Sequence, residues 1–206
     1  MTLIELDKGR DENLNERISS IHFEILTKLE PHCLFSVDST QDYLIRDLHS
    51  RKEGQFVTSR VQTKGRGRKG RMWISDEGGL YLSITLVPND PKVIDKIARV
   101  ASDAIMETLQ LDLDLDECSF KPPNDVIYRN KKIAGVLVDA EVKGGNSLAY
   151  VGMGVDLNNG KDWDTEIRKI ATSFWLETGK EADLDIFLIQ LLSRLDQAYY
   201  RLTKLA

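Results

Sequence analysis

The chain has 206 residues, a length that suits one compact domain. Hydrophobic residues make up 41% and charged residues 30%, a balance that supports a buried core and excludes global disorder. Its apolar runs are far shorter than a membrane span, and residues 1–7 lack the basic and apolar regions of a secretory signal. Two cysteines, Cys33 and Cys118, are too few for a disulfide scaffold or a four-cysteine zinc site. We therefore expect a soluble, cytoplasmic protein with no membrane partner.

The net charge of −5 is spread unevenly along the chain. Residues 60–71 contain six basic side chains and no acidic one, so the remainder has 22 basic and 33 acidic side chains, or a net charge of −11. A general nucleic-acid binder carries positive charge over a whole face of its surface. Here the excess of positive charge is confined to one loop, and we therefore expect no nucleic-acid partner. One basic loop in an acidic body indicates a local anion site, with a solvated loop as the alternative.

Periodicity predicts the elements of the first half of the chain. Residues 12–30 space their apolar side chains as on one buried face of a helix. Residues 33–37 form a predicted strand, and residues 38–40 offer N-cap chemistry to a helix that follows. A short strand over residues 55–59 leads into the basic loop, and residues 79–86 are rich in β-formers after a Gly-Gly turn.

Periodicity also predicts the helices and strands of the second half of the chain. Residues 93–111 form a predicted amphipathic helix. Three strands follow, over residues 126–128, 133–138 and 148–155, and a helix over about residues 184–205 closes the chain. Strands in the middle with helices between and outside them predict an α+β or mixed α/β fold around one central mixed sheet.

The basic loop matches two nucleotide-binding patterns only formally. Residues 65–70 read Gly-Arg-Gly-Arg-Lys-Gly, but a dinucleotide fingerprint must open a helix, and this loop leads towards a turn and a strand. A P-loop is excluded because Arg71 and Met72 stand where Lys and Ser or Thr are required. Glycines let backbone amides form an anion-binding nest, and arginines grip carboxylate or phosphate oxygens with two hydrogen bonds. The loop is therefore a candidate anion site that closes when the anion binds.

Four blocks of sequence stand in a recognisable order. A Ser-Thr element lies at residues 38–40, and the Gly- and Arg-rich loop with its following Trp lies at residues 62–73. Lys-Pro-Pro-Asn-Asp at residues 121–125 is followed by Lys-Ile-Ala-Gly at residues 132–135, and Gly-Met-Gly-Val-Asp stands at residues 152–156. Together these blocks resemble the motifs of the biotin protein ligases, enzymes that biotinylate carrier domains, and the resemblance covers nearly the whole chain.

The resemblance implies a fold related to the catalytic core of class II aminoacyl-tRNA synthetases. It also implies two chemical steps: biotin and ATP give biotinyl-5′-AMP and pyrophosphate, with Mg²⁺ as the metal, and a lysine of a biotin carboxyl carrier domain then takes the acyl group. That carrier would belong to a biotin-dependent carboxylase. The sequence leaves open whether the protein forms a homodimer.

The resemblance also implies three sets of site residues. The biotin-binding set is Ser39, Thr40, Gln62, Gly65, Arg66, Trp73, Gly135, Leu137, Gly152 and Gly154. The set for ATP and the adenylate is Arg68, Arg71, Asn124, Asp125, Lys132 and Asp156, with Asp125 also implied as a metal ligand. Lys132, Arg66 and Arg68 are the implied catalytic residues, which agrees with the positive charge needed to join a carboxylate to a phosphate.

The sequence departs from the family pattern at two positions and in its architecture. Pro122 stands where Trp is usual, and Asp156 stands where Asn is usual, which puts aromatic packing near the nucleotide and the local charge in doubt. We expect residues 1–206 to form one catalytic domain, with residues 1–31 as an N-terminal helical extension. We expect neither a winged-helix DNA-binding domain nor a C-terminal SH3-like barrel.

Two alternatives remain open at this point. The first is a lipoate or octanoate ligase of the same fold, although such enzymes lack the Gly-Arg-Gly-Arg loop. The second is a non-catalytic module that binds biotin or its adenylate, against which Lys132 and Arg66 argue. A Ser-His-Asp hydrolase is excluded, because all three histidines precede the basic loop and the sequence has no G-x-S-x-G motif.

Overall fold

The computed structural model describes residues 7–49, 51–144 and 146–204. In these residues a seven-stranded mixed sheet has the order β1-β2-β3-β7-β6-β5-β4. Only β1 and β2 pair in parallel, and the other neighbours are antiparallel. The strands are β1 (Glu30–Val37), β2 (Gln55–Gln62), β3 (Leu80–Leu86), β4 (Cys118–Lys121), β5 (Asp125–Tyr128), β6 (Lys131–Lys143) and β7 (Asn146–Val155). The predicted mixed sheet with flanking helices is confirmed.

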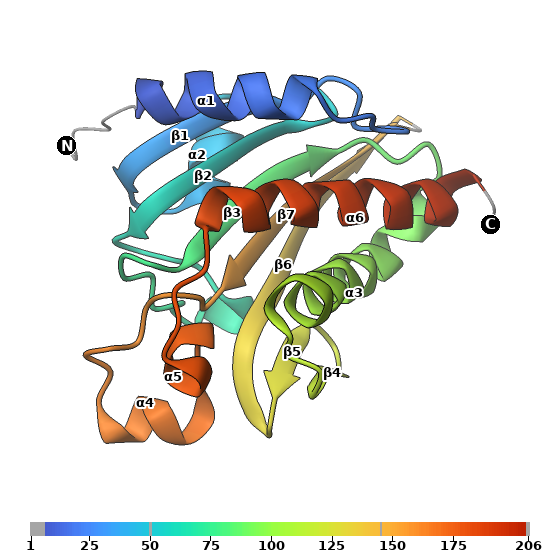
Figure 1. Cartoon of the computed structure of the whole chain (residues 1–206). Helices are drawn as coiled ribbons and strands as arrows, with labels where there is room; N and C mark the ends of the chain where they lie inside the picture. Colours follow the sequence, from blue (N-terminus) through green and yellow to red (C-terminus); the bar gives the residue numbers. More distant parts are fainter. Residues whose placement is uncertain (1–6, 50, 145, 205–206) are drawn as a thin grey trace.

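Helices cover both faces of this sheet. They are α1 (Lys8–Ser19), α2 (Thr40–Arg46), α3 (Ile94–Leu113), α4 (Thr165–Ile170), α5 (Phe174–Thr178) and α6 (Leu184–Lys204), with short 3₁₀ turns at Arg68–Gly70 and Pro91–Val93. Figure 1 shows α3 and α6 next to each other across one face. Side chains of α1, α3 and α6 share one buried cluster with that face, whereas α2 packs in a smaller cluster on the opposite face, called here the α2 face.

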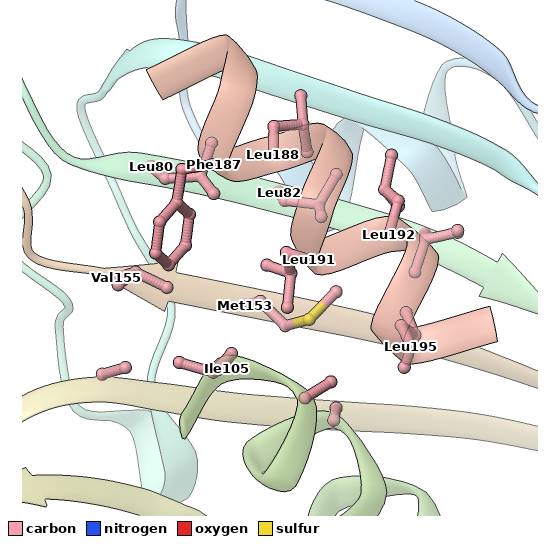
Figure 2. Close-up of a cluster of buried hydrophobic side chains, with 14 of the residues drawn as sticks. Leu80, Leu82, Ile105, Met153, Val155, Phe187, Leu188, Leu191, Leu192 and Leu195 are labelled. Atoms are coloured by element: carbon pink, nitrogen blue, oxygen red, sulfur yellow. The ribbon is translucent and has the colours of Figure 1, made fainter. Parts of the chain in front are cut away.

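The larger cluster holds α6 against the centre of the sheet. Figure 2 shows Leu188, Leu191, Leu192 and Leu195 of α6 over residues of β3 and β7, with Ile105 of α3 beside them. These leucines recur at helical spacing, so one stripe of α6 enters the core. Every residue of β3 is buried, because the strand lies between β2 and β7 and is covered on both faces.

The prediction of one helix over residues 12–30 is wrong. Helix α1 ends at Ser19, and residues 20–29 form a turn, bends and irregular segments. The buried carboxylate of Asp196 on α6 accepts backbone N–H bonds from Glu24, Ile25 and Leu26 at 2.6, 2.9 and 2.7 Å. These amides therefore find their partner outside a helix, although Leu26 is still buried and Ile25 packs against the core with its apolar spacing unchanged.

The other predicted elements are confirmed with shifted ends. The predicted strand at residues 133–138 is part of the longer β6, and the sequence analysis did not assign β4, α4 or α5. Among the residues described, no helix is long and apolar enough to cross a membrane.

A substitution on α6 tests the packing of the sheet. Leu191→Ala removes a side chain with 0% exposure from the core, and we expect it to lower the free energy of unfolding by about 3 kcal/mol, the usual cost of such a cavity. Ile186→Ala on the same helix, where the side chain is 47% exposed, is the matched control and should cost about 1 kcal/mol or less. Urea denaturation measures both, and equal costs would contradict the arrangement.

Candidate ligand-binding site

A pocket of about 270 Å³ opens on the α2 face of the sheet. Its floor is hollow because adjacent positions of three strands carry small residues on this face. Ser83 of β3 is paired with Gly152 of β7, and Gly154 of β7 is paired with Gly135 of β6. The neighbouring positions in these strands point to the opposite face and fill the large core cluster. Small side chains at register-matched positions therefore make the space for a ligand.

The pocket gathers fourteen of the sixteen predicted site residues. These are Ser39, Thr40, Gln62, Arg66, Arg68, Arg71, Trp73, Asn124, Asp125, Lys132, Gly135, Leu137, Gly152 and Gly154. Gly65 lies instead on a neighbouring hollow between the loop and β6, and Asp156 is buried and lines neither hollow. Segments that are far apart in the sequence thus meet at one place.

One end of the pocket is a chain of hydrogen-bonded polar side chains. The amide oxygen of Gln62 accepts the Thr40 backbone N–H at 2.8 Å and the Thr40 hydroxyl lies 3.1 Å from it. The Thr40 hydroxyl also lies 2.8 Å from that of Ser83, and the Gln62 amide nitrogen donates to Ser75 at 2.8 Å. Ser39 caps α2, as predicted, by accepting the Asp42 N–H. The polar end is therefore preorganised by its own hydrogen bonds.

The other end of the pocket is cationic. The Lys132 ammonium lies 2.6 Å from a carboxylate oxygen of Asp125 and 4.8 Å from the centre of the Trp73 ring. Arg68 donates to the side-chain oxygen of Asn124 at 3.2 Å. Asn124 is itself fixed, since its amide donates to the Val136 carbonyl at 2.5 Å. Lys132 and Arg68 thus reach the same pocket from β6 and from the loop.

Arg66 is held at the pocket by two carboxylates from different elements. One guanidinium nitrogen lies 2.7 Å from Asp42 of α2, and the other lies 2.9 Å from Asp139 of β6. The loop folds back on itself, because the backbone N–H of Trp73 donates to the Gly65 carbonyl at 2.9 Å. A Cβ at Gly65 would lie 2.5 Å from the Trp73 carbonyl oxygen, so only glycine fits there. The loop continues into β3 and opens no α-helix, as the sequence analysis expected.

The space above the pocket's glycines is occupied by protein side chains. A Cβ at Gly154 would lie 2.6 Å from the Trp73 ring, and a Cβ at Gly152 would collide with the side-chain oxygen of Gln41. The family resemblance assigns Gly152 and Gly154 to the biotin-binding set. In this structure they bring backbone close to Trp73 and Gln41, which line the pocket themselves.

The sequence analysis missed residues that complete the site. Gln41 and Ser83 line the pocket, and Asp42 and Asp139 hold Arg66. Gln41 could have been found, since it directly follows the Ser39-Thr40 element. Asp139 and Ser83 carry no local signal, because only the strand register brings them to the pocket.

Asp125 is the pocket carboxylate that could accept a metal ion. Magnesium is commonly held by one or two carboxylates together with substrate phosphates, so a single carboxylate beside the cations fits that chemistry. Among the described residues, no group of three or more His, Cys, Asp or Glu side chains could hold a metal without such a substrate.

Asp156 is buried, with 4% exposure, and is not among the residues that line the pocket. Asn159 donates to its carboxylate at 2.7 Å. Burial raises the pKa of Asp156 to about 8, although the hydrogen bond from Asn159 and the charge of Lys132 act to lower it. Asp156 therefore lies near the cations without lining the pocket, and its predicted contact with ATP stays a prediction.

The raised pKa of Asp156 predicts how stability depends on pH. Between the ordinary aspartate pKa of about 3.9 and about 8, the folded protein keeps a proton that the unfolded chain has lost. The free energy of unfolding therefore falls as the pH rises through this range and levels off above it.

The variant Asp156→Asn removes this titration and keeps the oxygen that accepts from Asn159. We expect its stability advantage over the parent protein to grow by about 3 kcal/mol from about pH 5 to about pH 8. Thermal unfolding across this pH range measures the difference. Asp162→Asn, at an exposed position of the same segment, is the control. Parallel pH curves for Asp156→Asn and the parent would contradict the buried titration.

Comparison with known proteins places these features in a family. Residues 34–158 match the family model described as "Biotin/lipoate A/B protein ligase family". The bifunctional ligase/repressor BirA of Escherichia coli is 33% identical over 124 residues, which cover 59% of this chain and 38% of that protein. The biotin--[acetyl-CoA-carboxylase] ligase of Paracoccus denitrificans is 30% identical over 132 residues, which cover 63% of this chain and 55% of that protein. The chain thus spans about half of these relatives' length or less.

A solved structure agrees over more of the chain. The biotin protein ligase from Aquifex aeolicus, in complex with biotin and ATP, superposes with a TM-score of 0.74 at 33% identity. The superposition covers 86% of this chain and 72% of that one. Because the family match includes the Ser-Thr element, the basic loop, Lys132 and the paired glycines, the chain belongs to the biotin/lipoate A/B protein ligase family.

Proposed function

We propose that this protein is an ATP-dependent biotin protein ligase. It joins biotin to AMP and then transfers the biotinyl group to a lysine of a carrier domain. One observation carries this proposal: a single pocket has hydrogen-bonding side chains at one end and Lys132 and Arg68 at the other, with Arg66 bound to Asp139 beside Gln41. The related Aquifex aeolicus enzyme, which was solved with both biotin and ATP, supports the same pair of substrates.

The first step brings two anions together, and the cations of the pocket make this feasible. The biotin carboxylate attacks the α-phosphorus of ATP, a carboxyl–phosphate bond forms, and the bond to pyrophosphate breaks. Lys132 neutralises charge on the phosphates, and Arg66 and Arg68 hold the new acyl phosphate. These cations are paired with side chains of the protein before the substrates bind, so each exchanges a protein partner for a substrate oxygen.

Asp125 would hold Mg²⁺ together with the phosphates. The ion would supply positive charge for the departing pyrophosphate when it is bound. Asp125 fits this role because its carboxylate lines the pocket beside Lys132 and is partly exposed.

The second step requires only an amine nucleophile. The neutral amine of the carrier lysine attacks the activated carbonyl, an amide bond forms, AMP leaves with the bonding electrons, and the amine loses one proton to solvent. We propose a biotin carboxyl carrier domain of a carboxylase as the acceptor, which the name of the Paracoccus denitrificans relative supports.

The polar end of the pocket favours biotin over lipoate as the acid. A ureido ring presents N–H donors and a carbonyl acceptor, which match Thr40, Gln41, Gln62 and Ser83. A dithiolane ring offers no such groups and would leave buried polar atoms unpaired.

Intact mass measurement of a carrier domain tests the proposed function. With ATP, Mg²⁺ and the protein, the carrier should gain one biotinyl group when biotin is supplied and remain unmodified when lipoate is supplied. A carrier that gains a lipoyl group and no biotinyl group would overturn the choice of substrate. A carrier that gains neither group would contradict the ligase activity and favour a non-catalytic module that binds biotin or its adenylate.

A lysine substitution tests the chemistry of the first step. Lys132→Ala should reduce formation of biotinyl-AMP at least about hundred-fold, the usual effect of removing a preorganised charge-stabilising group. Biotin binding should change little, because Lys132 acts on the phosphates. Lys131→Ala, at the neighbouring lysine outside the pocket lining, is the matched control. Loss of biotin binding by Lys132→Ala with an intact fold would contradict the role assigned to Lys132.

A loop substitution tests how the adenylate is retained. Arg68→Gly removes a guanidinium from the acyl phosphate and adds flexibility to the loop, so the adenylate should escape about ten-fold to hundred-fold faster. AMP release should then exceed carrier labelling, which a comparison of the two rates measures. Lys64→Gly adds a glycine to the same loop away from the main pocket and controls for flexibility. Unchanged coupling in Arg68→Gly would show that Arg68 does not close the site.

A further inference from the structure

Two buried polar atoms of the pocket have no hydrogen-bond partner within the described part of the chain. They are the side-chain oxygen of Gln41, an acceptor, and the indole nitrogen of Trp73, a donor. Gln41 is 3% exposed, so bulk water does not satisfy its oxygen. An unpaired buried acceptor is costly, and an enclosed pocket keeps one at little net cost when its ligand supplies a donor.

The orientation of the Gln41 amide is fixed by Asp139. The amide nitrogen of Gln41 donates to a carboxylate oxygen of Asp139 at 3.0 Å, across 98 positions of sequence. An ionised carboxylate only accepts hydrogen bonds, so the NH₂ group of Gln41 must face Asp139. The carbonyl oxygen of Gln41 therefore faces the pocket floor at Gly152.

The same oxygen of Asp139 also binds Arg66, whose guanidinium lies 2.9 Å away. This second contact holds the Asp139 carboxylate in place. Within the described part of the chain, Asp42 binds Arg66 at 2.7 Å, whereas the Gln41 amide donates to Asp139 and not to Asp42. Both aspartates thus bind Arg66, and Asp139 also binds the Gln41 side chain.

We propose that Asp139 is a positioning residue that sets the polarity of Gln41, so that the Gln41 oxygen selects an acid bearing an N–H donor. This inference rests on the proposed function, in which that donor is a ureido N–H of biotin. Gln41 acts as an acceptor only, because Asp139 occupies its NH₂ group. An acid without an N–H at this position leaves the acceptor unpaired and binds more weakly.

Calorimetric titration of biotin, without ATP, tests the inference independently of catalysis. Gln41→Met keeps the size of the side chain and removes the acceptor, and Asp139→Asn lets the Gln41 amide turn over. Each should weaken biotin binding about five-fold to ten-fold, the usual effect of one neutral hydrogen bond. The double variant should bind biotin no more weakly than Gln41→Met, because Asp139 acts through Gln41.

Asp42→Asn is the matched control. It removes one carboxylate from Arg66, as Asp139→Asn does, and leaves the Gln41 contact intact. Asp139→Asn should therefore bind biotin at least about five-fold more weakly than Asp42→Asn. Methylation of a ureido nitrogen removes its N–H donor. The affinities of the parent and of Gln41→Met should therefore differ less for this methylated biotin than they do for biotin. A structural role alone would weaken both ligands equally.

The outcomes separate the inference from the proposed function. Parent protein that binds biotin as tightly as Asp139→Asn and Gln41→Met would overturn the role of Asp139 and leave the ligase proposal standing. Additive losses in the double variant would also overturn it, because Asp139 would then act by another route. Parent protein that does not bind biotin would contradict the proposed function itself, and the inference would fall with it. Thermal unfolding of each variant checks that the fold is retained.

Discussion

The Trp73 ring lies against two paired glycines, and the geometry of the pocket depends on this contact. Gly135 and Gly154 face each other across β6 and β7, and a Cβ at either would come within about 3 Å of the ring. Because both are glycine, the indole lies against the backbone and its face meets the Lys132 ammonium at 4.8 Å. The same residue closes the basic loop through its N–H to Gly65. By seating Trp73, the glycine pair therefore fixes the positions of one wall of the pocket, of the Lys132 ammonium and of the base of the loop at Gly65.

Charge pairing explains how several cations gather in one pocket. Lys132 has Asp125 as its partner, Arg66 has Asp42 and Asp139, and these contacts offset the repulsion between the cations. All of these side chains are partly exposed, so the pairs are only modestly stabilising and are readily exchanged for substrate oxygens. The pocket thus combines a preorganised polar floor with cations that can change partners, as the proposed reaction requires.

The sequence predicts the elements well where local patterns decide them and poorly where distant partners do. The strands other than β4 and the Ser39 cap carry local signals. The end of α1 does not, because the amides of Glu24 to Leu26 are bound by Asp196, about 170 positions away. Motif resemblance predicted most of the residues that line the pocket. It missed Asp139, whose place depends on the register of β6 and on Gln41. Its assignment of Asp156 to the nucleotide stays a prediction for a side chain that is buried and does not line the pocket.

The central claim is that one pocket couples a polar acid-binding end to cations that act on the α-phosphate. Exchange of labelled pyrophosphate into ATP measures this coupling directly, because exchange requires reversible formation of the acyl adenylate and no carrier. The account predicts exchange that depends on biotin, disappears without it, and is not restored by lipoate. Exchange that proceeds equally with lipoate, or no exchange with biotin in a folded protein, would contradict the account.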